Sequence, residues 1–97
     1  MEVRWSPAAD RDRSVIFDHI AADNPWAAID MDALFDKAAQ TLHEHPRMGA
    51  PGKVARTREW VIHASYRLVY QVDETPQATI VRVLALVHTA RQWPPKR

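Results

Sequence analysis

The spacing of apolar residues changes from a helical period in the first half of the chain to a period of two in the second half. Residues 2–5 alternate polar and apolar side chains and predict a short strand. Ser6-Pro7 then places an N-cap residue before a proline at the first helical position, which predicts a helix from there to about Ala22. We expect its buried stripe to contain Val15, Ile16 and Ile20.

The pair Asn24-Pro25 repeats this start signal and predicts a second helix. Its apolar residues follow the i, i+4, i+7, i+11 spacing of a buried face, and His45-Pro46 ends it because the residue before a proline disfavours helical geometry. Together the two segments predict an antiparallel helical hairpin. The buried face of the second helix is expected to contain Met31, Phe35, Ala38 and Leu42.

Both glycines fall in residues 46–53, which predict a loop before the strands begin. Three segments then predict strands, at residues 58–63, 66–72 and 78–88. The last is apolar on both faces, which is typical of a strand in the interior of a sheet. The order β-α-α-β-β-β predicts an α+β fold, with the hairpin packed on one face of a small antiparallel sheet. We expect residues 1–97 to form a single domain.

Composition favours a folded protein without disulfides. Of the 97 residues, 46% are hydrophobic and 26% are charged, which is too apolar for a disordered chain. The absence of cysteine excludes a disulfide framework, a thiolate nucleophile and a cysteine-type zinc site. The longest apolar run, residues 83–87, is far too short to span a membrane, and the first residues lack a secretion signal. We therefore expect a cytoplasmic protein that does not contact a membrane.

The formal net charge of +1 hides a strong polarity along the chain. Residues 1–45 carry four basic and nine acidic side chains, a balance of −5. Residues 46–97 carry nine basic and three acidic side chains, a balance of +6. This asymmetry indicates either that the second half binds an anion, most commonly a nucleic acid, or that the two halves of one domain attract each other.

The usual motifs of metal and phosphate chemistry are missing, so we expect no metal site and no cofactor. His43 and His45 flank Glu44, but two residues apart on a helix they point about 200° apart, which is not the spacing of a helical zinc pair. Gly49 and Gly52 precede a strand and not a helix, so they do not form a phosphate-binding loop. The three serines do not form a nucleophile elbow.

Basic side chains are concentrated in the predicted sheet, with aromatic side chains between them. Arginine binds phosphates and aromatic rings stack on unpaired bases, so this combination favours single-stranded RNA over duplex DNA. Arginine and histidine together could also cleave RNA, by activating the ribose 2′-hydroxyl without a metal. Alternatively, each basic residue is simply solvated at the end of a strand. The residues concerned are Lys53, Arg56, Arg58, Arg67, His88 and Arg91, with Trp60, Tyr66, Tyr70 and Trp93.

The order and spacing of these segments resemble the RelE/ParE superfamily of toxins. The resemblance covers nearly the whole chain and includes Asn24-Pro25 and His45-Pro46 around the second helix. It also includes Arg56-Thr-Arg-Glu-Trp-Val61, Tyr66-Arg-Leu-Val-Tyr70 and the ending Val87-His-Thr-Ala-Arg-Gln-Trp93. The resemblance implies the toxin of a bacterial type II toxin–antitoxin system. Its implied partner is a cognate antitoxin encoded by an adjacent gene, in a hetero-oligomer with the toxin.

The superfamily implies two activities for this chain. RelE-like members cleave mRNA in the ribosomal A site without a metal, and ParE-like members poison DNA gyrase. We expect the ribosome-dependent endoribonuclease, because the ending from His88 to Arg91 is often lacking in ParE-like relatives. The gyrase poison is the first alternative, and a non-catalytic module that binds RNA or protein is the second.

The resemblance also implies roles for individual residues. Arg67 and Arg91 occupy the places from which cleaving relatives contact the scissile phosphate, and His88 occupies that of an acid or base. These three are the expected catalytic residues. The residues expected to bind RNA, the ribosome or the antitoxin are Lys53, Arg56, Arg58, His63 and Trp93.

Overall fold

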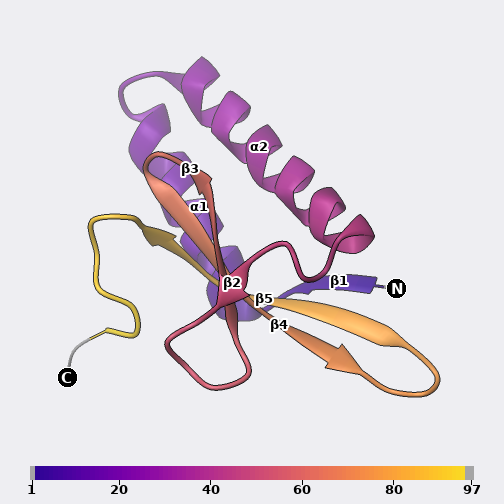
Figure 1. Cartoon of the computed structure of the whole chain (residues 1–97). Helices are drawn as coiled ribbons and strands as arrows, with labels where there is room; N and C mark the ends of the chain where they lie inside the picture. The colour runs from indigo at the N-terminus through magenta and orange to yellow at the C-terminus, as the bar shows by residue number, and fades with distance from the viewer. Residues whose placement is uncertain (1, 96–97) are drawn as a thin grey trace.

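The computed structural model describes residues 2–95, which form two helices and a five-stranded sheet (Figure 1). The predicted α+β fold and its element order are confirmed, with a two-residue strand added inside the predicted loop. Met1, Lys96 and Arg97 lie outside the described residues. Neither helix is long and apolar enough to cross a membrane. The elements are β1 (Glu2–Trp5), α1 (Pro7–Ala21), α2 (Pro25–Glu44), β2 (Ala50–Pro51), β3 (Arg58–His63), β4 (Tyr66–Glu74) and β5 (Thr79–His88).

Both predicted helix N-caps are confirmed. Ser6 Oγ accepts a hydrogen bond from the Ala9 N–H at 3.0 Å, and Asn24 Oδ1 accepts one from the Ala27 N–H at 3.2 Å. In each helix a proline occupies the first turn, where its missing N–H leaves no helical hydrogen bond unmade. α2 ends directly before the predicted stop, His45-Pro46.

The sheet is mixed, because its first strand runs parallel to its last. The strand order is β1-β5-β4-β3-β2. β1 pairs with β5 in parallel, from Glu2 opposite Ile80 to Trp5 opposite Val83. The predicted antiparallel pairing holds for β2 through β5 and not for β1. β5 has a neighbour on each side, as its two apolar faces predict, while β4 is the middle strand.

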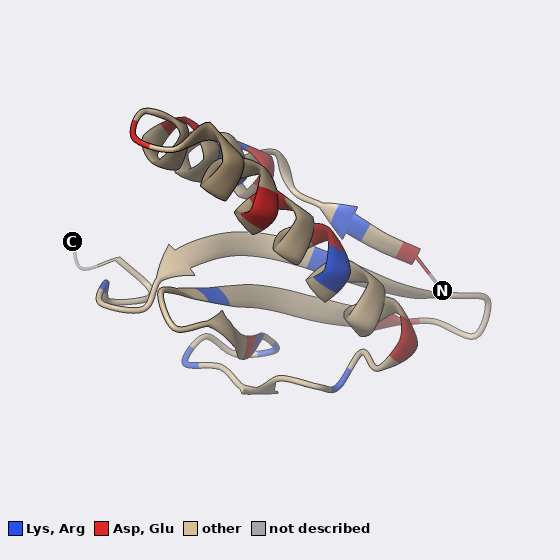
Figure 2. Ribbon diagram, turned by 90° about the horizontal axis from the view of Figure 1, so that it is seen from above, with Lys and Arg blue, Asp and Glu red and all other residues tan. Residues whose placement is uncertain are grey.

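The helical hairpin covers one face of the sheet (Figure 2), and the main core lies between the two layers. Phe35 and Leu42 of α2 are buried there with Leu68 and Tyr70 of β4, and each of these side chains is at most 1% exposed. Of the partly buried side chains that pack around this centre, four connect α1, α2 and β3 to it. They are Ile16, Met31, Trp60 and Ile62.

The predicted apolar stripe of α1 is wrong at Val15. The Val15 side chain is 67% exposed, whereas Ile16 packs against the core and Ala9 is fully buried. Ala9 and Ile16 are seven residues apart and share one face of the helix. Val15 lies about 100° away from Ile16 around the helix axis and so points away from the sheet.

Candidate functional site

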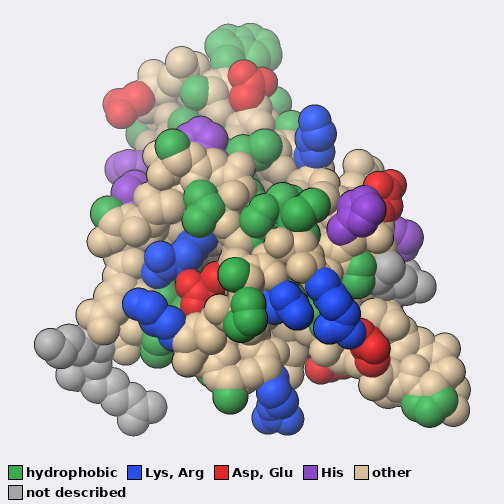
Figure 3. Space-filling model, in the orientation of Figure 1, with side chains coloured by type: hydrophobic (Ala, Val, Ile, Leu, Met, Phe, Trp, Pro, Cys, Tyr) green, Lys and Arg blue, Asp and Glu red, His purple; other side chains and the backbone are tan. Residues whose placement is uncertain are grey.

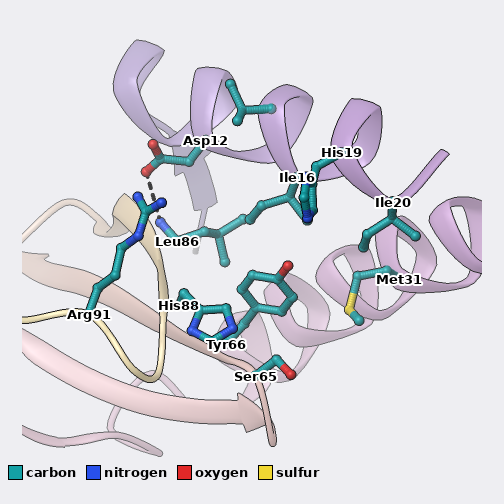
Figure 4. A pocket seen from close by; sticks show the side chains of 11 residues that line it. Asp12, Ile16, His19, Ile20, Met31, Ser65, Tyr66, Leu86, His88 and Arg91 are labelled. Atoms are coloured by element: carbon teal, nitrogen blue, oxygen red, sulfur yellow. Dashed lines mark hydrogen bonds between the residues drawn. The ribbon is translucent and has the colours of Figure 1, made fainter. Parts of the chain in front are cut away.

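A cavity of about 540 Å³ lies between α1 and the ends of β4 and β5 (Figure 4). Ile16 and Ile20 of α1, Met31 of α2 and Leu86 of β5 make much of its wall apolar. The exposed Val15 also lines it. We call this space the His88–Arg91 cavity, because both of these predicted site residues line it.

His88 is held at the end of β5 by its neighbours on the sheet. It pairs across the strands with Tyr66, and the two ring centroids lie 5.6 Å apart with an angle of 81° between the ring planes. His88 Nδ1 accepts a hydrogen bond from the Ala90 N–H at 3.1 Å. In the neutral imidazole the proton therefore lies on Nε2, so this nitrogen can donate a hydrogen bond to a bound oxygen.

Arg91 lies in the turn that follows β5, where its N–H donates to the His88 carbonyl oxygen at 2.9 Å. Its side chain reaches back toward Asp12 of α1 (Figure 4). The Asp12 carboxylate itself accepts a hydrogen bond from the Leu86 N–H at 3.1 Å, at a point where β1 no longer covers the edge of β5. Within residues 2–95 no ion pair holds the Arg91 guanidinium. The cavity therefore offers a cation and an imidazole beside an apolar wall.

Arg67 lies on the other face of the sheet. Its neighbours along β4, Tyr66 and Leu68, point into the core beneath the hairpin, so Arg67 points the opposite way. On that outer face its Nε lies 3.4 Å from Glu59 Oε1, and both side chains are only 17% exposed. Its Nη2 donates to the backbone carbonyl oxygen of Arg91 at 2.9 Å. The structure thus brings His88 and Arg91 together and leaves Arg67 outside their cavity.

Trp93 also lies on the outer face. It packs against a second apolar cluster formed by Val69, Ala85 and Val87 of β4 and β5. Its Nε1 is buried and has no hydrogen-bond partner in the described part of the chain. Trp93 therefore covers the sheet where the helices do not, and its ring is partly buried by this packing.

Two of the predicted binding residues line a separate cavity of about 390 Å³, near the beginning of β3. Arg56 and Arg58 lie there together with Arg47, which was not among the site residues predicted from the sequence. We call this space the arginine cleft. Arg47 could have been selected from the sequence, because it lies in the glycine- and proline-rich loop, close to the other basic residues.

The remaining predicted binding residues lie elsewhere. Lys53 is exposed in the loop after β2, and its backbone N–H donates to Glu59 Oε2 at 2.9 Å. His63 ends β3, and its Nδ1 accepts a hydrogen bond from the Ser65 N–H at 3.0 Å. The eight predicted site residues are therefore distributed over two cavities, the outer face, the loop after β2 and the end of β3. Figure 3 shows Lys and Arg side chains gathered around β2 and the neighbouring loops.

A buried tyrosine supports the loop beside the arginine cleft. The Tyr70 hydroxyl oxygen accepts a hydrogen bond from the Gly49 N–H at 2.8 Å. A Cβ at position 49 would lie 3.0 Å from this hydroxyl and 2.9 Å from the Glu59 carbonyl oxygen, so only glycine fits without displacement. Burial raises the pKa of Tyr70, and the Gly49 hydrogen bond and the nearby Arg58 and Arg47 offset part of that rise.

The described residues contain no group of three or more His, Cys, Asp or Glu side chains that could hold a metal ion. The polar side chains that line the His88–Arg91 cavity are Asp12, His19, Ser65, Tyr66, His88 and Arg91.

Comparison with known proteins agrees with the fold. Residues 3–93 match the family model described as the ParE toxin of the type II toxin–antitoxin system parDE. A curated relative from Sinorhizobium fredii, named "Putative toxin Y4kP", is 32% identical over 93 residues, covering 95% of this chain and 92% of the relative.

Two solved structures share the fold. One is described as the chromosomal ParDE TA system from P. aeruginosa, with a TM-score of 0.75 and 17% identity over 91% of this chain and 95% of the other. The second is a YoeB/ParE toxin from Agrobacterium tumefaciens, with a TM-score of 0.64 and 16% identity over 91% of this chain and 98% of the other. The family match, which extends from the first strand to the tail beyond β5, shows that the chain belongs to the ParE toxin family of type II toxin–antitoxin systems.

Proposed function

We propose that this toxin acts by binding DNA gyrase and poisoning it, so that DNA replication stops, and that its antitoxin prevents this. The proposal reverses the order expected from the sequence, in which mRNA cleavage stood first. Two observations support it. The family model that the chain matches is that of the ParE toxin, and Arg67 lies on the opposite face of the sheet from His88.

The position of Arg67 is the observation that carries the proposal. Cleavage of RNA requires a proton-transfer group and charge-stabilising donors within hydrogen-bond reach of one phosphate. Arg67 Nη2 donates a hydrogen bond to the backbone carbonyl oxygen of Arg91, and Arg67 Nε lies beside the Glu59 carboxylate on the outer face. His88 and the Arg91 side chain line the cavity on the helix side. This arrangement favours action through a protein surface over cleavage by the three residues together.

The direct test uses the purified chain and DNA gyrase. We expect loss of ATP-dependent supercoiling and accumulation of cleaved DNA that is released by detergent and protease. Addition of the cognate antitoxin in excess should restore supercoiling, and a heat-unfolded sample of the same chain serves as the control. Normal supercoiling at high toxin concentration, together with codon-phased cuts in ribosome-bound mRNA, would rule the proposal out.

The second candidate function is the metal-independent cleavage of mRNA on the ribosome. The observation that favours it is the placement of His88 and Arg91 in one cavity, where a phosphate could contact both. If this function holds, Arg91→Ala should slow cleavage by about 10²–10³, because it removes a charge-stabilising donor. His88→Gln should slow it by about 10²–10⁴ while ribosome binding is retained. Primer extension on mRNA from translating ribosomes measures both effects.

A further inference from the structure

The arginine cleft lies where β4 continues beyond its neighbour β3. The register of the sheet pairs Arg58, the first residue of β3, with Tyr70 of β4. Residues 71–74 of β4 pair with β5 on one side, and on the other side no strand is paired with them within residues 2–95. Alternate N–H and C=O groups of this segment therefore point to an open strand edge.

The charge of the cleft is not balanced by its own residues. Arg58 donates to the Gly49 carbonyl oxygen at 2.6 Å, and a carbonyl leaves the positive charge of the guanidinium uncompensated. The carboxylate in the cleft, Asp73, is paired with Arg82 at 2.6 Å. Arg47 pairs with Glu74, but both of these side chains are more than half exposed, so the pair is weak and can exchange partners.

Arg56 adds a second uncompensated cation. Its φ of 64° places it in the left-handed region, which is uncommon for a residue other than glycine. The side chain is exposed at the cleft, and none of the described residues forms an ion pair with it. Arg56 and Arg58 are therefore both available to an anionic group, beside the open edge of β4.

A strand edge and two arginines fit one kind of ligand better than others. An extended peptide can pair its backbone with the open edge while its carboxylates bind the guanidinium groups. A nucleic-acid phosphate would use the arginines and leave the strand edge unpaired. Pro51 and Val72 add apolar wall to the cleft, which an extended peptide can contact with alternate side chains.

We propose that an acidic, extended segment of the antitoxin adds as a strand to β4 along residues 71–74, with its carboxylates on Arg56 and Arg58. The proposal rests on the antitoxin partner that the family implies, and it does not depend on whether gyrase or the ribosome is the target. The unpaired backbone N–H and C=O groups of residues 71–74 offer hydrogen bonds to the added strand. The uncompensated Arg56 and Arg58 select a segment that carries negative charge.

Two measurements on the full-length chain with its cognate antitoxin test this strand addition. Hydrogen exchange should slow at residues 71–74 when the antitoxin is added. The variant Arg56→Asn keeps a residue that tolerates the left-handed conformation and removes the charge. It should speed dissociation of the complex by about 10- to 100-fold, the range expected for one charge-assisted hydrogen bond. Arg11→Gln, at an exposed position of α1, is the matched control and should leave the dissociation rate unchanged.

Three outcomes would overturn the proposal. One is unchanged exchange at residues 71–74 with the antitoxin bound. Another is equal dissociation rates for Arg56→Asn and Arg11→Gln. The third is protection of residues 71–74 by a short single-stranded oligonucleotide and not by the antitoxin. Inhibition of gyrase by the toxin is measured without antitoxin, so that assay tests only the proposed function. The exchange and dissociation measurements test only the strand addition, and the two proposals can therefore fail separately.

Discussion

The guanidinium of Arg67 donates a hydrogen bond to the backbone carbonyl oxygen of Arg91 at 2.9 Å. These two residues were expected to hold the same phosphate with their side chains. Instead, the Arg67 side chain binds the backbone of Arg91 at the turn after β5. The Arg91 side chain lies on the cavity side. Arg67 thus ties the C-terminal segment to the outer face of the sheet.

The first prediction concerns this tie. Arg67→Ala should lower the free energy of unfolding by about 1–3 kcal/mol, because it removes a charge-assisted hydrogen bond and leaves the mostly buried Glu59 without its cation. Backbone amides of residues 89–93 should also exchange faster. Denaturant unfolding and hydrogen exchange measure the two effects. Unchanged stability together with loss of RNA cleavage would instead indicate a catalytic Arg67.

The second prediction concerns the core. Phe35 is 1% exposed and meets Tyr66 edge-to-face, with ring centroids 5.9 Å apart. Phe35→Ala should therefore cost about 3–5 kcal/mol, a large part of the stability of so small a domain. Val15→Ala, at an exposed position on the neighbouring helix, should change stability by no more than about 0.5 kcal/mol. Equal losses for the two variants in urea unfolding would mean that the core is misplaced.

The third prediction concerns alkaline pH. Burial raises the pKa of Tyr70 in the folded protein above its ordinary value of 10.0. The stability from the neutral hydroxyl is therefore fully present below about pH 10 and is lost as the pH rises through the folded pKa. Thermal unfolding from about pH 8 to about pH 11 should show this loss.

Tyr70→Phe provides the control for that experiment. It cannot ionise, so its alkaline loss of stability should be smaller than that of the natural chain. At neutral pH the variant should be less stable by about 1–3 kcal/mol, because the Gly49 N–H loses its acceptor. Parallel stability curves for the two proteins above pH 10 would show that another group is responsible.

The fourth prediction concerns the contact between the helices and β1. The Arg13 guanidinium lies 4.8 Å from the centroid of the Trp5 ring and forms ion pairs with Asp32 at 2.6 Å and Asp36 at 2.7 Å. Hydrogen bonding to Asp32 is the main reason that the pKa of Arg13 is raised, so its charge persists at any working pH. Arg13→Lys should lower stability by about 1–2 kcal/mol, because lysine keeps the charge and loses the planar fork.

A double-mutant cycle tests the origin of this effect. Arg13→Met and Asp32→Asn, alone and combined, should show a coupling energy of about 0.5–3 kcal/mol, since the two side chains are in direct contact. Arg13→Met with Asp30→Asn is the matched comparison, because Asp30 is exposed on α2, the helix of Asp32, and the ion pairs of Arg13 are with Asp32 and Asp36. Zero coupling in the first cycle would assign the effect of Arg13 to its other contacts, Asp36 and Trp5.

Local chemistry made the helices and their ends predictable from sequence. Ser6 and Asn24 each accept a hydrogen bond from an N–H three residues later, so the signal and the structure lie within one turn. The buried face of α2 was predictable for a similar reason. Phe35 and Leu42 recur with the helical period, and a helix presents residues at that spacing to one side.

Pairing between distant segments was decided only in the tertiary structure. Glu2 pairs with Ile80, although the two residues are 78 positions apart in the sequence. No local pattern predicts that their strands run parallel. The face of each site residue depends on the same strand pairing. Alternation along β4 sends Arg67 to the outer face, while His88 on β5 joins Tyr66 on the helix side. Motif spacing indicated which residues carry chemistry, but the register of the sheet determined which of them meet. The physical reason is that strand pairing joins residues remote in sequence, whereas capping and periodicity act within a few residues.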